Sequence, residues 1–528
     1  MAEFGQPYRR WEPEGEYDAL VIGSGIGGLG AAALLAQHAG MRVLVLERHA
    51  TKAGGFTHIF KRESWDWDVG LHYVGEVHRP DSSLRRLFDG ITGGRLQWQS
   101  MGDVYDTVIV GDERFEYVAG RQAWRDRMVE YFPTDENAID RYLELVRETT
   151  IGARGFFGAK ALPGPAAAIA GPFMRRGFLR HASRTVAEVL DELTDNAMLK
   201  AVLTTQYGDY GLTPKKASFG IHAMVANHYL RGAGYPVGGS ARIAAEIIPE
   251  IEAAGGEVVV GAEVREILIE RGRAVGVRMA DDRELRAPMV ISDAGVPNTV
   301  HRLLPPHAPG RRALASVLER VTPSTSHVCL YVGLDATDQE LGLGTSNLWI
   351  FPGPNHDANV ERYLDDPSSP IPLTYISFPS AKDPDFSNRH PGKATIEVVS
   401  IAPYEWFSAW EDETWQKRGE EYESFKDRFI VRLLEVLGRE VPQIAGKIGY
   451  HELSTPLSTR HFGAYEDGEI YGLDHTPARF KAKGLRPKTP VPGLWITGQD
   501  VCTAGIAGAL YGGVLCASGI LGKNLLKV

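Results

Sequence analysis

Cysteine is scarce in this chain of 528 residues, and a surplus of basic charge is absent. Its three cysteines, Cys329, Cys502 and Cys516, form no CxxC pair, so they predict neither a disulfide framework nor a zinc site, and they indicate a reducing compartment. The net charge of −10 disfavours nucleic acid as a partner, because phosphate binding normally requires a basic surplus. We therefore expect a cytoplasmic protein without a metal site.

Long apolar runs are also missing, with one exception. Residues 1–16 lack the apolar core of a signal peptide, and we interpret them as a short polar lead-in. Residues 501–522 are uncharged and long enough to cross a bilayer, but they include six glycines, which weaken a helix, and few large apolar side chains. We predict that they form a helix packed inside the protein rather than a membrane span.

What the chain does contain is a glycine-rich turn of the kind that holds a dinucleotide. The sequence GSGIGG at residues 23–28 has the spacing GxGxxG and lies between an apolar, strand-like run and an alanine-rich helix. The first glycine permits a tight turn, the second lets a pyrophosphate approach, and the third lets the helix pack on the strand. Glu47 ends the next predicted strand, where its carboxylate can accept hydrogen bonds from ribose hydroxyls.

Further glycines favour FAD over NAD as this dinucleotide. Gly54 and Gly55 follow the second strand closely, and residues 498–506 join a late strand to another glycine-rich helix. Three separated glycine-rich approaches suit a long cofactor with a ribityl chain and a flavin ring. Because the chain has no second complete GxGxxG unit, we predict no dedicated site for NAD(P)H.

The pattern of helices and strands predicts an α/β (α+β two-domain) flavoprotein. A second α/β block begins near residue 234, and a β-meander follows it. The stretches between these blocks are helical or mix strands with loops. We predict a Rossmann-type FAD-binding domain in three pieces, residues 1–78, 235–304 and 485–528, and a mixed helix and sheet substrate-binding domain at residues 79–234 and 305–484.

Several longer motifs carry a family resemblance. The glycine fingerprint, Glu47 with the glycine pair, and DVGLHY at residues 68–73 resemble the phytoene desaturase and carotenoid isomerase branch of the FAD-dependent, amine oxidase-like superfamily. Within that branch, residues 221–268 and 493–513 are most similar to the retinol saturases. The resemblance implies FAD as the cofactor and chemistry on a hydrophobic small molecule, namely a conjugated polyene, an isoprenoid or a lipid.

The resemblance also implies which residues hold FAD, all of them in the three pieces of the predicted nucleotide domain. Val264 is expected to meet the adenine through its backbone. The full set is Gly23, Ser24, Gly25, Ile26, Gly28, Glu47, Gly54, Gly55, Phe56, Thr57, Val264, Asp293, Ala294, Gly498, Asp500, Gly505 and Ile506.

Candidate catalytic residues follow from the chemistry. Saturation of a C=C bond needs a hydride, which reduced flavin can supply, and a proton for the other carbon. His72 and Tyr73 follow the glycine pair and are candidate proton donors, the alternative being that they only hydrogen-bond within the structure. Tyr229 is a third candidate. At helical spacing it shares a face with His222 and Ala226. We hypothesise that this face lines a polyene tunnel, the alternative being that it only packs between domains.

Three functions are compatible with this sequence. Saturation of a polyene, as in the retinol saturases, is the one we favour, and it requires an electron donor that the sequence does not identify. A carotenoid-type desaturase or cis–trans isomerase would use the same scaffold. A non-catalytic escort protein that binds prenyl or lipid groups is the third, but it would have no need of an intact dinucleotide fingerprint.

One segment has the composition of a membrane-contacting surface. No acidic residue occurs between Glu148 and Glu188, and within residues 151–184 phenylalanines are mixed with arginines and a lysine. Aromatic and basic side chains together suit the headgroup region of an anionic bilayer, from which an apolar substrate could be drawn. A mobile lid, or a basic surface facing an acidic subunit, would have the same composition.

Overall fold

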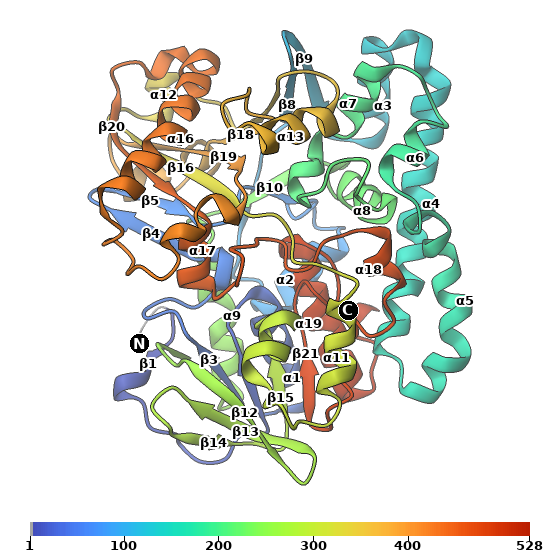
Figure 1. Cartoon of the computed structure of the whole chain (residues 1–528), viewed down its shortest axis with the longest axis vertical. Coiled ribbons are helices and arrows are strands. Elements are labelled where there is room, and N and C mark those ends of the chain that lie inside the picture. The colour runs from blue at the N-terminus through green and yellow to red at the C-terminus, as the bar shows by residue number, and fades with distance from the viewer. Residues whose placement is uncertain (1–3, 528) are drawn as a thin grey trace.

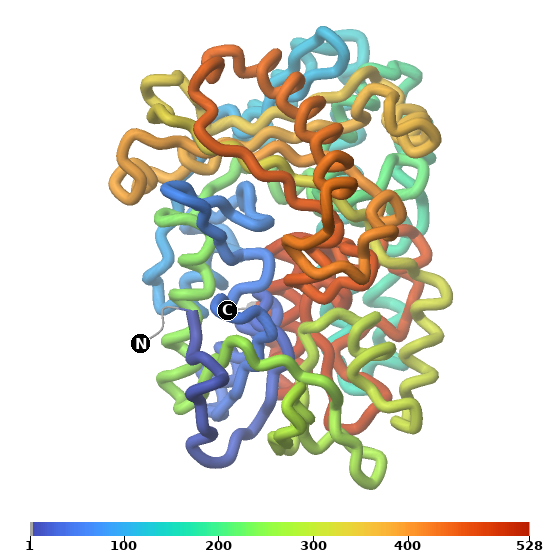
Figure 2. Tube along the Cα trace, turned by 60° about the vertical axis from the view of Figure 1, so that its left-hand side comes forward, coloured from blue at the N-terminus to red at the C-terminus, as the bar shows by residue number. Residues whose placement is uncertain are grey.

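The computed structural model describes residues 4–527, so residues 1–3 of the predicted polar lead-in and residue 528 lie outside the description. The lower half of the molecule in Figure 1 is built on a six-stranded parallel sheet. Its strands lie in the order β1 (Gln6–Pro7), β11 (Glu257–Val260), β3 (Val43–Glu47), β2 (Ala19–Ile22), β15 (Val290–Ser292) and β21 (Leu494–Ile496). They come from three separated stretches of sequence, whose blue, green and red tubes lie together in Figure 2. The exact domain boundaries stay predictions.

Both faces of this sheet are covered, which explains why its strands are apolar throughout. Alternate side chains of β2 and β3 point to opposite faces and join two different clusters of the core. The helices on one face are α1 (Ile26–Ala39), α9 (Arg242–Glu252) and α19 (Gly505–Leu521). The other face carries a meander of β12 (Val264–Glu270), β13 (Arg273–Met279) and β14 (Glu284–Arg286). The predicted α/β fold class with a Rossmann-type sheet is confirmed.

Helix α19 accounts for the uncharged segment near the C-terminus. Its glycines permit close packing: a Cβ on Gly513 would lie 2.6 Å from the carbonyl oxygen of Gly27 in α1. The helix is buried against α1 and against α4 (Glu136–Ala161), as predicted. Among the residues that the structure describes, no helix has both the length and the apolar character that a bilayer crossing requires.

The upper half contains a mixed seven-stranded sheet. Its strands lie in the order β20 (Ile448–Ser454), β16 (His327–Leu334), β19 (Ala394–Ile401), β18 (Thr374–Ser377), β17 (Asn347–Phe351), β8 (Val104–Val110) and β9 (Glu113–Val118). One face packs against the amphipathic helix α16 (Gly419–Glu440) in a separate apolar cluster. The opposite face of β16 and β19 looks toward the nucleotide sheet, and the candidate site lies between the two sheets.

Helices flank both halves at one edge of the molecule, on the right in Figure 1. The long helix α4 pairs with α5 (Gly164–Ala182), and both contact α8 (Phe219–Tyr229). Three short strands connect the halves: β6 (Val74–Gly75), β10 (Ala233–Pro236) and β7 (Trp98–Ser100). A hairpin of β4 (Ile59–Arg62) and β5 (Trp65–Asp68) extends from the nucleotide half toward the upper sheet.

Candidate active site

A cavity of about 930 Å³ lies between the carboxyl ends of the parallel strands and the open face of the upper sheet. Ligands of open α/β sheets bind outside the carboxyl ends of the strands, which is where this cavity begins. Its volume is at the upper end of the range for small-molecule and cofactor sites. A single chamber therefore spans the predicted nucleotide site and part of the predicted substrate domain.

The glycine turn is shaped by close backbone contacts. Gly23 has a φ of +97°, a conformation that favours glycine. A Cβ on Gly25 would lie 2.5 Å from a carboxyl oxygen of Asp293, and one on Gly27 would lie 2.6 Å from the Cα of Gly498. The turn, the end of β15 and the end of β21 thus converge so tightly that no side chain fits between them.

Two helix N-termini face the cavity without side-chain caps. Neither Gly25, before α1, nor Ala504, before α19, provides a capping hydrogen bond, and the first residues of both helices line the cavity. The first N–H groups of a helix have no partner within the helix, so they are available to an anionic ligand. Together with the glycine turn, this arrangement fits the pyrophosphate of a dinucleotide.

Acidic residues complete the nucleotide end of the cavity. The carboxylate of Glu47 accepts hydrogen bonds from the backbone N–H and the hydroxyl of Ser24, at 3.0 and 2.6 Å, and from the N–H of His49 at 2.7 Å. These bonds hold the Glu47 carboxylate at the end of β3, where it can accept hydrogen bonds from the ribose hydroxyls of a dinucleotide. Burial raises the pKa of Asp293 to about 8, so this carboxyl is mainly neutral at pH 7 and can lie beside a phosphate group.

The predicted cofactor residues line the cavity, with one exception. Gly28 packs instead against the start of the turn, just after β2, since a Cβ there would lie 2.5 Å from the carbonyl oxygen of Gly23. The Asp500 carboxylate lines the wall but is held within the protein, accepting hydrogen bonds from the N–H groups of Val296 at 2.7 Å and Leu473 at 2.9 Å. Asp500 therefore braces two loops around the site.

The far end of the cavity carries apolar and aromatic side chains that were not predicted from the sequence. Along β16, His327, Cys329 and Tyr331 line the cavity, while the residues between them pack into the core beneath. Val399 of β19, paired with Cys329, adds to the same wall. The alternation of side chains along β16 could have indicated which residues share a face of the strand. Because both faces carry apolar side chains, the sequence did not show which face meets a cavity.

Of the three candidate catalytic residues, only His72 lines the cavity. Its side chain is 22% exposed, and its Nδ1 lies 2.9 Å from a carboxylate oxygen of Glu397. The ammonium of Lys382 donates a hydrogen bond of 3.0 Å to the backbone carbonyl of His72 and so fixes this part of the chain. Burial lowers the pKa of His72 to about 3, which makes a neutral imidazole at the cavity wall.

Tyr73 and Tyr229 are buried behind the wall. Their rings stack with centroids 4.2 Å apart, and the Tyr73 hydroxyl donates to Asp106 at 3.2 Å and to Asp209 at 3.3 Å. The predicted tunnel face of α8 is part of this packing, because His222 lies between two tyrosine hydroxyls of the core. Helical spacing correctly grouped these residues on one face, but it carries no information on what that face meets.

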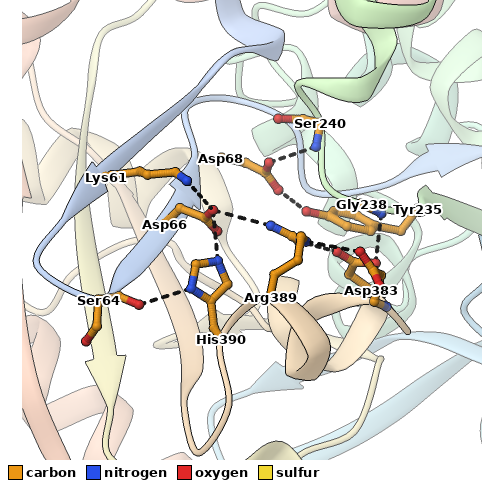
Figure 3. A network of polar contacts seen from close by, with 11 residues as sticks. Lys61, Ser64, Asp66, Asp68, Tyr235, Gly238, Ser240, Asp383, Arg389 and His390 are labelled. Atoms are coloured by element: carbon orange, nitrogen blue, oxygen red, sulfur yellow. Dashed lines mark hydrogen bonds and ion pairs between the residues drawn. The ribbon is translucent and has the colours of Figure 1, made fainter. Parts of the chain in front are cut away.

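A polar network beneath the cavity holds the β4–β5 hairpin, and Figure 3 shows it from close by. Asp68 accepts hydrogen bonds from the N–H of Ser240 at 3.0 Å and from the hydroxyl of Tyr235. The guanidinium of Arg389 joins Asp66 on the hairpin to Asp383 on the segment between β18 and β19. Since His72 lies only four residues after Asp68, the end of β5, the network helps to set the position of the imidazole.

Known proteins resemble this chain over almost its whole length. A family model described as an NAD(P)-binding Rossmann-like domain matches residues 21–91. The all-trans-retinol 13,14-reductase of Danio rerio is 41% identical over 97% of this chain and 87% of its own. A Danio rerio protein named inactive all-trans-retinol 13,14-reductase is 33% identical, over 96% of this chain and 86% of its own. The chloroplastic prolycopene isomerase of Arabidopsis thaliana is 26% identical over 98% of this chain and 84% of its own.

Solved structures extend the comparison to the fold. A structure of putrescine oxidase bound to putrescine has a TM-score of 0.62 and 17% identity, over 97% of this chain and 100% of that one. At this identity the likeness shows the fold alone. The Rossmann-like family model agrees with the nucleotide end of the cavity, since residues 21–91 include the glycine turn and Glu47. The relatives confirm the resemblance seen in the sequence, and the chain belongs to the all-trans-retinol 13,14-reductase family of oxidoreductases.

Proposed function

We propose that the protein binds FAD and uses it to saturate a C=C bond of a long conjugated polyene such as a retinoid. The observation that carries this proposal is the single cavity, which joins a glycine-lined nucleotide end to an aromatic and apolar end. One relative is named inactive, so activity in this family depends on the residues of the site. The glycine turn, Glu47 and both uncapped helix ends are all present.

The chain's own residues have defined tasks in this reaction. Bound FAD, once reduced, supplies the hydride that saturation requires. The wall formed by β16 and Val399 offers apolar and aromatic side chains against which the polyene can lie, and His72 presents a neutral imidazole from which a proton can reach the second carbon. Desaturation or cis–trans isomerisation would use the same slot, whereas a non-catalytic escort would make no use of the nucleotide end.

Product mass distinguishes these functions. We expect purified protein to carry FAD and, after anaerobic reduction with dithionite, to convert all-trans-retinol or a carotenoid to a product heavier by two hydrogens. In a parallel incubation with oxidised flavin and an added electron acceptor, a product lighter by two hydrogens would replace saturation with desaturation. With reduced flavin, an isomer of unchanged mass would replace saturation with isomerisation. A protein that binds the polyenes without flavin and without turnover would be an escort, and the proposal would be wrong.

We also propose that the outward face of α5 contacts an anionic membrane surface, which places the protein peripherally on a membrane. Ile169 is 76% exposed and Phe173 is 80% exposed, and the exposed Arg176 lies on the same helix, at the outer edge of the molecule in Figure 1. Fewer residues of segment 151–184 lie on this surface than its composition indicated. Phe156, Phe157 and Phe178 are core residues, and Lys160 donates a hydrogen bond of 2.8 Å to the carbonyl of Val501.

Replacing Ile169 and Phe173 together with serine tests this surface. We expect binding to liposomes with anionic lipid to weaken about tenfold or more, because two large side chains no longer enter the acyl region. Val431→Ser is the matched control, since Val431 is 55% exposed on a different helix, α16, and this variant should bind like the parent protein. Equal binding by the double variant and the control would rule out α5 as the contact.

A further inference from the structure

Glu397 is a buried carboxyl with few partners. It lies on β19 opposite Tyr331, its side chain is 0% exposed, and neither of its carboxyl oxygens makes a well-formed hydrogen bond among the described residues, although the backbone N–H of Asp68 is close enough to lower its pKa. A buried charge without partners is costly, and buried polar groups are normally hydrogen-bonded. Because this burial lowers the stability of the fold, a functional role would account for the Glu397 carboxyl.

A polar atom of the cavity wall lies beside Glu397. Its Oε2 lies 2.9 Å from Nδ1 of His72, within hydrogen-bonding distance, although the ring is not yet oriented for the bond. Nδ1 is itself buried, so the exposed part of the ring is the opposite edge, which carries Nε2. The imidazole thus lies between a hidden carboxyl and the cavity. The other titratable groups whose charges act on Glu397, or on which Glu397 acts, are Asp68, Tyr235, Cys329, Tyr331, Tyr375 and Lys382.

The protonation states of Glu397 and His72 allow a proton to pass from the carboxyl to the imidazole. Burial raises the pKa of Glu397 to about 8, and burial lowers the pKa of His72 to about 3. At pH 7 both groups are mainly neutral, so the carboxyl can donate its O–H to Nδ1. That bond would place the imidazole proton on Nε2, at the edge that faces the cavity.

We propose that Glu397 is the proton store behind His72, and that together they deliver the proton of the saturation reaction. This inference rests on the proposed function. His72 is the residue that contacts the substrate, and Glu397 acts through it as a positioning and proton-supplying residue.

The two carbons of the double bond receive a hydride and a proton from different sources. One carbon of the double bond receives a hydride with its electron pair from the two-electron reduced flavin, which is thereby oxidised. The other carbon receives the Nε2 proton of His72, while the proton of Glu397 moves to Nδ1, so the imidazole ends neutral. The carboxylate that remains interacts with Lys382, whose positive charge lowers the pKa of Glu397 and whose own pKa burial lowers to about 7. The carboxylate regains a proton from solvent after product release.

Infrared spectroscopy of the flavin-bound protein without substrate tests the store independently of turnover. We expect a protonated-carboxyl band at pH 7 that is absent from Glu397→Gln, that titrates away near pH 8, and that shifts in His72→Asn. The matched control is Glu469→Gln, because Glu469 is also a buried glutamate whose pKa is raised, to about 7, and it does not line the cavity. Its replacement should leave the Glu397 band in place. A Glu397→Gln spectrum identical to that of the parent protein would overturn the inference.

A single-turnover experiment tests delivery of the proton. Protein reduced with dithionite is mixed anaerobically with polyene, and flavin reoxidation is followed across pH. We expect the parent rate to decline as pH rises through about 8, and Glu397→Gln to be about 100-fold slower with this decline gone. An unchanged rate and profile in Glu397→Gln would also overturn the inference. If the parent protein reduces no polyene, the proposed function fails, whereas the infrared result still decides whether Glu397 holds a proton.

Discussion

Replacing Gly27 with alanine is expected to abolish flavin binding. The added Cβ would lie 2.6 Å from the Cα and 2.8 Å from the backbone nitrogen of Gly498, and backbone atoms cannot rotate away as a flexible side chain can. Helix α1 and the loop after β21 would have to separate, and the cradle for the pyrophosphate would open. Overpacking of this kind costs about 1–3 kcal/mol even where a core can adjust. Flavin absorbance per polypeptide and the thermal unfolding temperature, measured on the same preparation, give both effects.

Gly438 provides the matched control for this substitution. It is also a helical glycine, in α16, but a Cβ there meets no atom within 4 Å. Gly438→Ala should retain full flavin content and gain about 0.5–1 kcal/mol of stability, because alanine is the better helix former. If Gly27→Ala bound flavin as well as Gly438→Ala does, the close approach of α1 and the β21 loop would not be what forms the nucleotide site.

Replacing Arg389 with methionine is expected to lower the free energy of unfolding by about 3 kcal/mol, the lower end of the cost of breaking a buried ion pair. The change leaves the carboxylates of Asp66 and Asp383 without their shared guanidinium, and their side chains are only 6% and 1% exposed. His390 stays near Asp66 at 2.9 Å, and the N–H of Gly238 still donates to Asp383 at 2.9 Å, so the loss is partial. Urea unfolding at pH 7 measures it.

Arg286→Met is the control variant for the loss of unfolding free energy expected in Arg389→Met. Arg286 also joins two carboxylates, those of Glu270 and Glu284, but all three side chains are more than one third exposed on the meander. We expect no measurable change in its urea midpoint, since exposed ion pairs contribute little. Equal midpoints for the two variants would mean that the network in Figure 3 does not hold the hairpin.

The nucleotide end of the site could be predicted from sequence because its physical determinants are local. The GxGxxG turn requires glycine at positions that are near neighbours in the chain, and Glu47 lies one strand further on. Buried parallel strands are apolar on both faces, which identified β2 and β3. The glycine content of residues 501–522 likewise favoured a packed helix, and α19 is one. Each of these patterns depends on contacts within one βαβ unit or one helix.

The catalytic end was decided by tertiary structure alone. His72 and Glu397 are distant in sequence, and they meet because the β4–β5 hairpin docks on the upper sheet beside β19. Tyr73 and Tyr229 were equally plausible from their residue types, yet they pack in the core one layer behind the cavity. Periodicity states which side chains share a face, whereas what that face meets depends on how separate elements pack. The sequence therefore determined the cofactor cradle, and only the folded chain decided which polar groups border the polyene.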